Sequence, residues 1–374
     1  MKGMLMTELA EIVEHAFRNK DYAVAVDAWV RFNTAAGAEN RAAAPATQSN
    51  DSPRVAEITI DGISGHLGRS ASGTQVQLLI NGKLIGTTRA VQSRAMQSSA
   101  PANGFRLPVT SLWKYLGDND RLEVRDSTGT RLPFPGGREV FEIRSPLDSK
   151  VPALLKKLQK GFVVSKKGRL IEAFNSDSTH VQNCMDTFYA AHGVMLKTCG
   201  RKLFPICGSL LGAIRDKDFI PGDTDLDATF VSPYSNAASV KKDFMNVAKA
   251  LRRVGYKIAF ASSGMRVFPT PESTRKAFSI MLSWKREDGR LEMSYGRMGD
   301  LPRIEWPMHF VVGQLGKFSI DVPVESEALL QMSYGDGWRV PDPGFSHAGR
   351  KPGNREFLFT AVEKAEMERQ LSML

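Results

Sequence analysis

The segment 207–230, CGSLLGAIRDKDFIPGDTDLDATF, constrains the chain more than any other stretch. It places Asp223, Asp225 and Asp227 at alternate positions, shortly after the small pair Gly208–Ser209. Alternation with uncharged residues predicts a strand with all three carboxylates on one face. Carboxylates this close repel each other, so either some are protonated or a hard divalent cation binds them. We expect this cation to be Mg²⁺ or Mn²⁺.

The residues before the aspartates suit phosphate binding. The sequence KLFPICGSL, 202–210, predicts a short buried strand that ends in the turn Gly208–Ser209, and a helix follows to about residue 217. Backbone N–H groups at such a turn and helix start attract phosphate oxygens. Arg215 on this helix either stabilises developing charge or pairs with an aspartate, and we favour the pairing. An exposed acidic strand edge is the alternative to metal binding.

Composition sets outer limits. A chain of 374 residues, 42% hydrophobic and 24% charged, predicts a globular protein of two or three domains. The chain holds no long apolar run, and Glu8, Glu11 and Glu14 lie where a signal peptide would be apolar. We therefore expect a cytoplasmic protein. Contact with the inner face of the membrane is a further hypothesis. The three cysteines lack metal or disulfide spacing, and we interpret them as reduced.

The charge is basic. Of the net +10, residues 146–374 contribute +8, from 33 Lys and Arg against 25 Asp and Glu. A basic surface suits an anionic partner such as a nucleotide, a phosphorylated glycan or an anionic membrane face, although solubility alone explains it equally well. The basic run at 156–169 is either a solvated helix face, our default, or a contact with phosphate-rich material.

Four regions follow from the patterns along the chain. Residues 1–36 predict a helical hairpin that resembles one tetratricopeptide repeat, broken at 19–21. Residues 37–54 are small and polar, which predicts a linker. Short alternating strands with turns over 55–145 predict a β-sandwich accessory domain, and 146–374 is the expected catalytic domain.

The order strand, Gly-Ser, helix, turn and Asp-x-Asp resembles the nucleotidyltransferase (polymerase-β-like) fold. Within it the chain resembles the LicD family, which includes fukutin and fukutin-related protein. That family's core reads G-[TS]-L-L-G-x-x-R and then I-P-W-D-x-D-x-D, against GSLLGAIR at 208–215 and IPGDTDLD at 220–227 here. Gly222 replaces the aromatic residue, which puts substrate positioning in doubt but not metal binding.

A second, ordered match strengthens the resemblance, which extends over about 175–345. The family's C-terminal part carries a Val-Pro strand, a leucine-bearing helix and Tyr-Gly-x-x-Trp. The chain supplies all three in order: Val322–Pro323, Leu329–Leu330, Tyr334–Gly335 and Trp338.

The resemblance implies an α+β nucleotidyltransferase-like catalytic domain. It also implies metal-dependent transfer of phosphocholine, ribitol phosphate or a similar group from a CDP-linked donor to a hydroxyl of a surface glycan, such as capsule or lipopolysaccharide. The resemblance implies that Asp225 and Asp227 hold the metal, with Asp223 as ligand or neighbour, and that Asp223 or Asp227 accepts the hydroxyl proton. A glycan or lipid-linked glycan is then the acceptor, a membrane surface or a glycosyltransferase is a further partner, and no nucleic acid is expected.

Two other functions stay open. One is a nucleotidyltransferase acting on a small molecule, against which the Tyr-Gly-x-x-Trp segment argues. The other is a degenerate transferase core that serves as a binding or scaffold subunit, because the strand FSIMLSW at 278–284 lacks the further acid usual in this fold. Glu292 is a candidate for that acid, although we favour a surface strand residue.

The remaining polar and aromatic residues are given structural roles. We interpret Asp321, His309 and His347 as structural, and three tryptophans as core residues: Trp284, Trp306 and Trp338.

Overall fold

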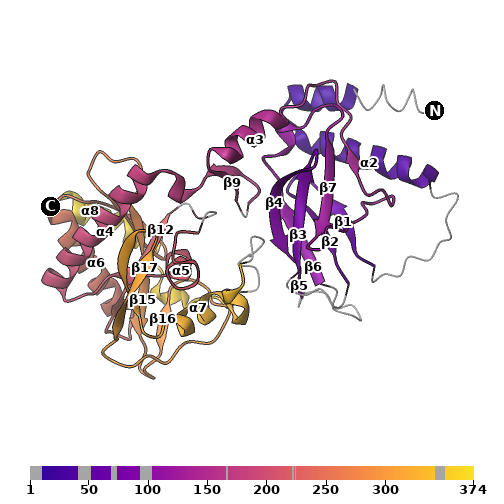
Figure 1. Ribbon diagram of the computed structural model, residues 1–374. Coiled ribbons are helices and arrows are strands. Elements are labelled where there is room, and N and C mark those ends of the chain that lie inside the picture. Colours follow the sequence, from indigo (N-terminus) through magenta and orange to yellow (C-terminus); the bar gives the residue numbers. More distant parts are fainter. Residues whose placement is uncertain are drawn as a thin grey trace. The chain divides into compact units, whose positions relative to one another are not determined.

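The computed structural model describes residues 11–40, 52–68, 74–92, 103–165, 167–220, 223, 225–341 and 350–374. The described residues form two compact units, one up to Ser176 and one from Asp177 onward. Helices and several separate sheets make the chain an α+β protein (Figure 1). Among the described residues, no helix is long and apolar enough to cross a membrane.

Two helices begin the first unit, over 11–18 and in α2 (Tyr22–Asn40), on either side of the predicted break at 19–21. Trp29 of α2 is fully buried, and its indole N–H donates to the backbone oxygen of Arg144 at 2.8 Å. A single helical pair cannot bury its own apolar face, so it must dock on a neighbour. Here the neighbour is the segment that carries strand β8.

The first unit contains two four-stranded antiparallel sheets. The first, in the order β1-β2-β6-β5, comprises β1 (Arg54–Ile58), β2 (Gly62–His66), β5 (Val91–Gln92) and β6 (Asn103–Pro108). The second, in the order β4-β3-β7-β8, comprises β3 (Gln75–Ile80), β4 (Lys83–Arg89), β7 (Arg121–Asp126) and β8 (Phe141–Glu142). The predicted turn at Asn81–Gly82 joins β3 to β4, and both residues have positive φ, as a tight two-residue hairpin requires.

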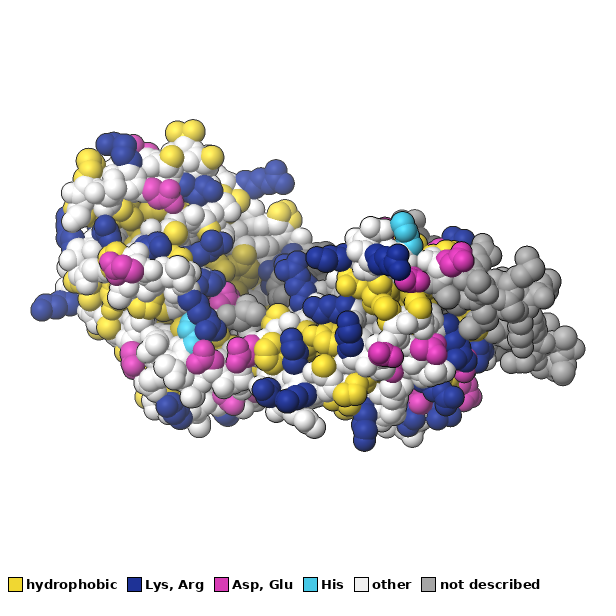
Figure 2. Space-filling view, turned by 90° about the horizontal axis from the view of Figure 1, so that it is seen from above, with side chains coloured by type: hydrophobic (Ala, Val, Ile, Leu, Met, Phe, Trp, Pro, Cys, Tyr) yellow, Lys and Arg dark blue, Asp and Glu magenta, His cyan; other side chains and the backbone are white. Residues whose placement is uncertain are grey.

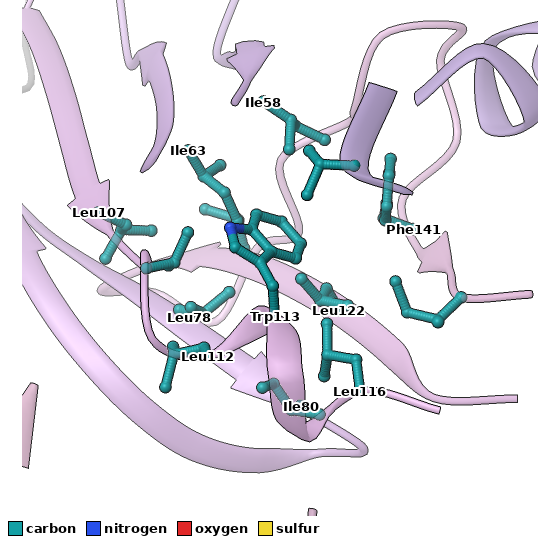
Figure 3. Close-up of a cluster of buried hydrophobic side chains, with 14 of the residues drawn as sticks. Ile58, Ile63, Leu78, Ile80, Leu107, Leu112, Trp113, Leu116, Leu122 and Phe141 are labelled. Carbon is teal, nitrogen blue, oxygen red and sulfur yellow. The ribbon is translucent and has the colours of Figure 1, made fainter. Parts of the chain in front are cut away.

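Trp113 is central to the apolar cluster in Figure 3, which brings together side chains from both sheets. It lies in the 3₁₀ turn η2 (Trp113–Tyr115) and is 1% exposed. Its indole N–H donates to the backbone oxygen of Ile60 at 2.8 Å, which satisfies the one polar atom of the side chain. Each fully buried Leu or Ile in such a cluster stabilises the fold by about 1.5–3 kcal/mol.

The end of the first unit is formed by α3 (Val151–Gln159), the hairpin β9 (Phe162–Val164) and β10 (Leu170–Glu172), and η3 (Phe174–Ser176). α3 buries Val151 and Leu154 and exposes its lysines, so the basic run includes a solvated helix face. Over the face seen in Figure 2, Lys and Arg side chains are interspersed with acidic, apolar and uncharged ones.

Two observed boundaries differ from the predicted ones. α2 continues to Asn40, four residues into the range 37–54, of which 41–51 lies outside the described residues. The units divide after Ser176 rather than at 146, because α3 contacts η2 and β9 contacts β4 within the first unit.

The second unit is built on a six-stranded sheet in the order β11-β12-β15-β14-β13, with β16 paired to the end of β15. Its strands are β11 (Phe204–Pro205), β12 (Leu226–Ser232), β13 (Lys257–Ala261), β14 (Gly264–Phe268), β15 (Phe278–Lys285) and β16 (Leu291–Met293). β12 and β15 run parallel to each other, whereas every other pair is antiparallel. The parallel pair therefore starts at one edge, where Leu226 lies beside Phe278.

Three helices, α4 (Ser178–Cys199), α6 (Ala237–Arg253) and α8 (Ala361–Ser372), lie together on one side of this sheet (Figure 1). α4 confirms the helix predicted for 180–199. Asp177 caps its start by accepting from the backbone N–H of His180, and left-handed Gly200 ends it.

The segments that complete the second unit include both matched motifs. They are α5 (Cys207–Leu211), the π-helical turn η4 (Gly212–Asp216), the hairpin β17 (Phe310–Leu315) and β18 (Phe318–Pro323), α7 (Ser326–Tyr334), η5 (Asp336–Arg339) and η6 (Arg355–Phe357). Pro323 thus ends a strand and the leucine pair lies on a helix, as predicted.

Candidate active site

The Gly208–Ser209 pair lies in the first turn of a helix, not in a turn before it. The predicted strand over 202–210 is reduced to Phe204–Pro205, and α5 begins at Cys207 rather than at Leu210. Cys207 has φ of +53°, a left-handed conformation that is uncommon for a residue with a side chain. Because of this bend, the helix begins directly after the strand, and Gly208 and Ser209 lie in its first turn.

Gly208 is in direct contact with the aspartate segment. A Cβ atom on residue 208 would lie 1.9 Å from Oδ2 of Asp223, so this position admits no side chain while Asp223 keeps its place. The helix start and the aspartate segment are therefore fitted to each other.

Ser209 fixes a second aspartate. Its Oγ accepts from the backbone N–H of Asp227 at 2.8 Å, and the residue is 5% exposed. Because the bond is made to the backbone, Ser209 fixes the start of β12 without using the Asp227 carboxylate.

The predicted strand over the three aspartates is wrong in extent. β12 begins at Leu226, so Asp227 lies in the strand, whereas Asp223 and Asp225 precede it in irregular structure. Strand alternation therefore does not place the carboxylates on one face. Among the described residues, no group of three or more His, Cys, Asp or Glu side chains is arranged to hold a metal ion. Gly222 lies outside the described residues.

Asp225 is paired with a lysine that the sequence analysis did not single out. Nζ of Lys276 lies 2.5 Å from Oδ2 of Asp225 and 2.8 Å from Oγ of Ser279. Ser279 stands directly beside Asp227 in the parallel register of β12 and β15. Lys276 is therefore held at the edge where both strands start.

Asp223 and Asp227 share a different neighbourhood, beside the thiol of Cys207 and the phenol of Tyr334, which are half-buried residues. Burial raises the pKa of the Cys207 thiol far above its usual value, and the negative charges of Asp227 and Asp223 add to the rise. Burial, Cys207, Asp223 and Asp227 likewise raise the pKa of the Tyr334 hydroxyl. The two carboxylates thus act on the same pair of neutral groups, whereas Asp225 is turned to Lys276.

Tyr295 and Arg350, both half-buried, complete this group. Burial raises the pKa of Tyr295 well above its usual value, and its hydroxyl hydrogen-bonds Oγ of Ser333 at 2.9 Å. The guanidinium of Arg350 lies 5.4 Å from the Tyr295 ring, and its positive charge opposes the rise in the pKa of Tyr334. Arg350 Nε is buried without a hydrogen-bond partner among the described residues. A positive charge and neutral donors therefore adjoin the Asp223–Asp227 pair.

Arg215 pairs with an aspartate, but not with one of the alternating three. Its guanidinium makes two hydrogen bonds to the carboxylate of Asp216, at 2.7 and 2.8 Å. It also donates to the backbone oxygen of Trp338 at 3.3 Å. Since Tyr334 adjoins the carboxylates and Trp338 contacts Arg215, the Tyr-Gly-x-x-Trp segment meets the first motif at two points.

Residues 201–319 match the family model of the LicD/FKTN/FKRP nucleotidyltransferase domain. The chain carries a LicD-family domain. This confirms the resemblance drawn from the sequence, and it identifies the second unit as the part of the chain related to a transferase family. A search of curated proteins finds no match to the chain. The matched segment of the LicD domain contains Gly208, Arg215 and the three aspartates, while Tyr334 and Arg350 lie beyond its end.

Other candidates in the LicD domain have partners away from the aspartates. Glu292 is 5% exposed on β16 and pairs with Arg286 at 2.6 Å, so it is neither a surface residue nor part of the carboxylate group. Asp321 pairs with Lys202 at 2.7 Å, and the backbone oxygen of His309 accepts from Val324. His347 lies outside the described residues.

The three tryptophans of the second unit differ from one another. Trp284 is fully buried and stacks on Phe357 with ring centroids 3.9 Å apart, and Trp338 is 6% exposed, so both are core residues. Trp306 is half-buried instead, with its indole N–H donating to the backbone oxygen of Gly289. None of the three contacts the aspartates through a described interaction.

Lys276, Tyr295 and Arg350 were missed by sequence reasoning. Lys276 is 51 residues from Asp225 along the chain, and the signal that could have found it is the absence of an acid from FSIMLSW. A strand that lacks the expected acid invites a search for a charge at its start. Tyr295 and Arg350 carry no such signal, because their positions depend on how α5, α7 and the C-terminal segment pack.

Proposed function

We propose that this chain transfers a phospho-alcohol group, such as phosphocholine or ribitol phosphate, from a CDP-linked donor to a hydroxyl of a surface glycan. The family of its domain supports phosphotransfer to glycans in general. The observation that carries the proposal is the close fit of Gly208 to the Asp223 carboxylate, because it joins the small-residue helix start to the acid segment. Both parts are needed at one place to handle a diphosphate.

The proposal includes a nucleotidyltransferase-like fold for the second unit. A parallel β12–β15 pair inside an otherwise antiparallel sheet, with helices together on one side, supports it. We likewise interpret the two four-stranded sheets of the first unit as a β-sandwich, since both contribute to one apolar core.

On this proposal, Asp223 and Asp227 would hold a divalent cation. Carboxylate oxygens are the ligands that Mg²⁺ and Mn²⁺ prefer, and such ions are commonly held by one or two carboxylates with water and substrate phosphate. The absence of a side chain at Gly208 leaves room for the Asp223 carboxylate at the helix start. When bound there, the ion would neutralise the diphosphate of the donor.

The chain's own groups would then orient the reactants and accept the proton that is released. Backbone N–H groups at the start of α5 would face phosphate oxygens. A carboxylate oxygen of Asp223 or Asp227 would accept the proton of the acceptor hydroxyl while the hydroxyl oxygen forms the new bond to phosphorus. The bond from that phosphorus to the oxygen of CMP breaks, and CMP leaves with the electron pair. Arg215 holds the Trp338 segment in place and does not touch the phosphates.

A binding or scaffold subunit is the second candidate. The observation in its favour is that Lys276 pairs with Asp225, so one of the three motif acids is already neutralised. A nucleotidyltransferase acting on a small molecule would instead release pyrophosphate from a nucleoside triphosphate. Further partners that we propose are a glycan or lipid-linked acceptor and a membrane surface or glycosyltransferase; we expect no nucleic acid.

The release of CMP from CDP-choline, CDP-ribitol and CDP-glycerol, with Mn²⁺ and without it, tests the proposal. We expect metal-dependent CMP release from one donor, and its loss in an Asp223→Asn, Asp227→Asn double variant. Asp300→Asn is the matched control, because that side chain is 94% exposed. No CMP from any donor would favour the scaffold, and pyrophosphate from a nucleoside triphosphate would favour the nucleotidyltransferase. Turnover that survives in the double variant contradicts the assigned carboxylates.

A further inference from the structure

Arg350 is a half-buried cation beyond the end of the matched domain, and it has no acid partner among the described residues. One N–H of its guanidinium donates to the backbone oxygen of Ser333 at the long distance of 3.4 Å, while Nε is buried with no partner in the described part of the chain. A guanidinium carries five N–H donors and is always charged. Charged groups withdrawn from water are as a rule paired, so this one has donors and charge to spare for an anion.

The backbone around Arg350 is held closely in place. Lys351 and Arg297 exchange two backbone hydrogen bonds, at 2.8 and 2.9 Å. Gly296 allows this approach, because a Cβ there would lie 2.9 Å from the backbone oxygen of Lys351 and 3.1 Å from Cβ of Arg350. A Cβ on Gly353 would likewise meet a backbone oxygen, at 2.7 Å. The position of the guanidinium therefore follows from a close backbone fit and not from an ion pair.

Tyr295 lies between Arg350 and the start of α5. The guanidinium is 5.4 Å from the centre of the Tyr295 ring, and the hydroxyl of Tyr295 adjoins the thiol of Cys207. The next residue, Gly208, is the one that is fitted to the Asp223 carboxylate. Arg350 is thus connected to the acid segment through one ring and one helix start.

Arg350 and two of the motif aspartates act on the same hydroxyl. Asp223 and Asp227 raise the pKa of Tyr334, and the positive charge of Arg350 opposes that rise. A phosphate that binds near two carboxylates is repelled by them, and a guanidinium at the same place offsets the repulsion. Arg350 therefore stands where a negatively charged ligand of this site needs a cation.

The arginine inside the matched domain is already engaged. Arg215 makes two hydrogen bonds to the carboxylate of Asp216 and a third to the backbone of Trp338. Arg350 has none of these partners, so the two guanidinium groups differ in what they can still bind. Paired N–H donors of a guanidinium match two oxygens of a phosphate in geometry as well as in charge.

We propose that Arg350 binds the diphosphate of the donor, as a guanidinium that the C-terminal segment adds to the site of the matched domain. This rests on the proposed function, because it takes the anion to belong to a CDP-linked donor. Arg350 is then a binding residue for phosphate oxygens, and the cost of keeping its charge half-buried and unpaired is offset only when the donor is present.

Isothermal titration of the full chain with inorganic pyrophosphate, CDP and cytidine, all with Mg²⁺ in the buffer, tests the proposal. Arg350→Met should weaken the binding of pyrophosphate and of CDP at least roughly tenfold, because charged hydrogen bonds are lost, and should leave any affinity for cytidine unchanged. Arg350→Lys keeps the charge without the paired donors and should be intermediate. Arg350→Gln replaces the methionine variant if that one fails to fold.

A matched control and a stability measurement separate binding from a structural role. Arg355→Met removes an exposed arginine on η6 and should bind all three probes as wild type does. Arg350→Met should unfold at the wild-type urea concentration or above it, because no ion pair is lost. A lower urea midpoint with wild-type affinity for pyrophosphate and CDP would assign Arg350 a structural role and overturn the inference.

The remaining outcomes distinguish this inference from the proposed function. If Arg350→Met binds pyrophosphate and CDP within twofold of wild type, Arg350 does not bind the phosphates, while the CDP binding that remains still supports a CDP-linked donor. If pyrophosphate binding depends on Arg350 but CDP binds no more tightly and no donor releases CMP, the anion site is supported and the proposed transfer is not. If wild type binds neither pyrophosphate nor CDP, both fail.

Discussion

The carboxylate of Asp223 occupies the space in which a side chain on residue 208 would begin. The separation between an ideal Cβ on Gly208 and Oδ2 of Asp223 is 1.9 Å, far inside any contact that two such atoms make. The neighbouring residue, Ser209, holds the backbone of Asp227. Two adjacent small residues at the start of one helix thus position two aspartates by different means. Gly208 has no side chain and leaves room for the Asp223 carboxylate, whereas Ser209 holds the Asp227 backbone by a hydrogen bond.

Gly208→Ala is therefore expected to damage the site more than the fold. The atom displaced is the end of a flexible side chain, so Asp223 turns away, while alanine in a helix adds up to about 1 kcal/mol relative to glycine. We expect Mn²⁺ affinity and CMP release to fall at least roughly tenfold with little change in the free energy of unfolding. Isothermal titration and urea unfolding measure the two.

Two other glycines serve as references for this variant. Gly193→Ala, on an exposed part of α4 where an added Cβ meets nothing within 4 Å, should leave both metal binding and activity unchanged. Gly212→Ala meets the backbone oxygen of Asp218 at 2.4 Å, which cannot turn away, and should destabilise the fold. Equal Mn²⁺ affinity in Gly208→Ala and Gly193→Ala would contradict the contact.

Ser209→Ala tests the second means of positioning. The substitution removes the acceptor of the Asp227 N–H at a place that is 5% exposed, and an unsatisfied buried donor costs about 1–3 kcal/mol. We expect the free energy of unfolding, measured in urea, to fall by that amount and Mn²⁺ binding to weaken. Ser209→Thr keeps the hydroxyl and should recover part of both. A Ser209→Ala variant as stable as wild type would show that water satisfies the N–H.

The motif elements were predictable because their signals are local. The helix 180–199, the turn Asn81–Gly82 and the meeting of Gly208 with the acids depend on residues close in sequence. The strand over 223–231 was predicted too long for a physical reason. Alternation of charged and uncharged residues is typical of a strand, but it also fits an irregular segment whose charges have separate partners, as Asp225 has in Lys276.

Long-range partners account for most of what the sequence left undetermined. Arg215 pairs with its neighbour Asp216, which local spacing allows, but its bond to Trp338 crosses 123 residues. Glu292 has a strand position that is typical of a surface residue, and its ion pairs with Arg286 and Arg297, which the local pattern does not show, accompany its burial. The end of the first unit at Ser176 depends on contacts of α3 and β9 with earlier elements, which no local pattern encodes.

Arg215→Ala should affect stability as strongly as activity. The guanidinium is 13% exposed in its pair with Asp216 and bonds the Trp338 backbone, and hydrogen bonds to charged groups contribute about 1.5–3 kcal/mol. We expect the free energy of unfolding to fall within this range. If Arg215 instead stabilised the developing charge on phosphorus, CMP release would collapse while the protein unfolded at the wild-type urea concentration. Arg215→Lys, which loses the two parallel bonds, should be intermediate.

The raised pKa of the half-buried Cys207 predicts the alkaline limit of stability. Burial raises its pKa in the folded protein above the usual value, which is near 8.5 in an unfolded chain. Between those two pKa values the folded state keeps a proton that the unfolded state releases. The thiol therefore leaves the free energy of unfolding unchanged below about pH 8.5. Above that pH it lowers the free energy of unfolding, by up to about 1.4 kcal/mol per pH unit for one group. Burial also raises the pKa of Cys184, to about 12, which steepens the same slope.

Urea unfolding under reducing conditions at pH 7, 8, 9 and 10 measures this slope. Cys207→Ala removes one of the two protons and should give a shallower decrease than wild type above pH 8.5, even if the variant is less stable at pH 7. Cys184→Ala is a comparison for the slope alone, because its thiol on α4 also has a raised pKa but lies within the electrostatic reach of Asp225 and Lys276. The two variants should have similar slopes. An unchanged slope in Cys207→Ala would mean that the thiol ionises in the folded protein.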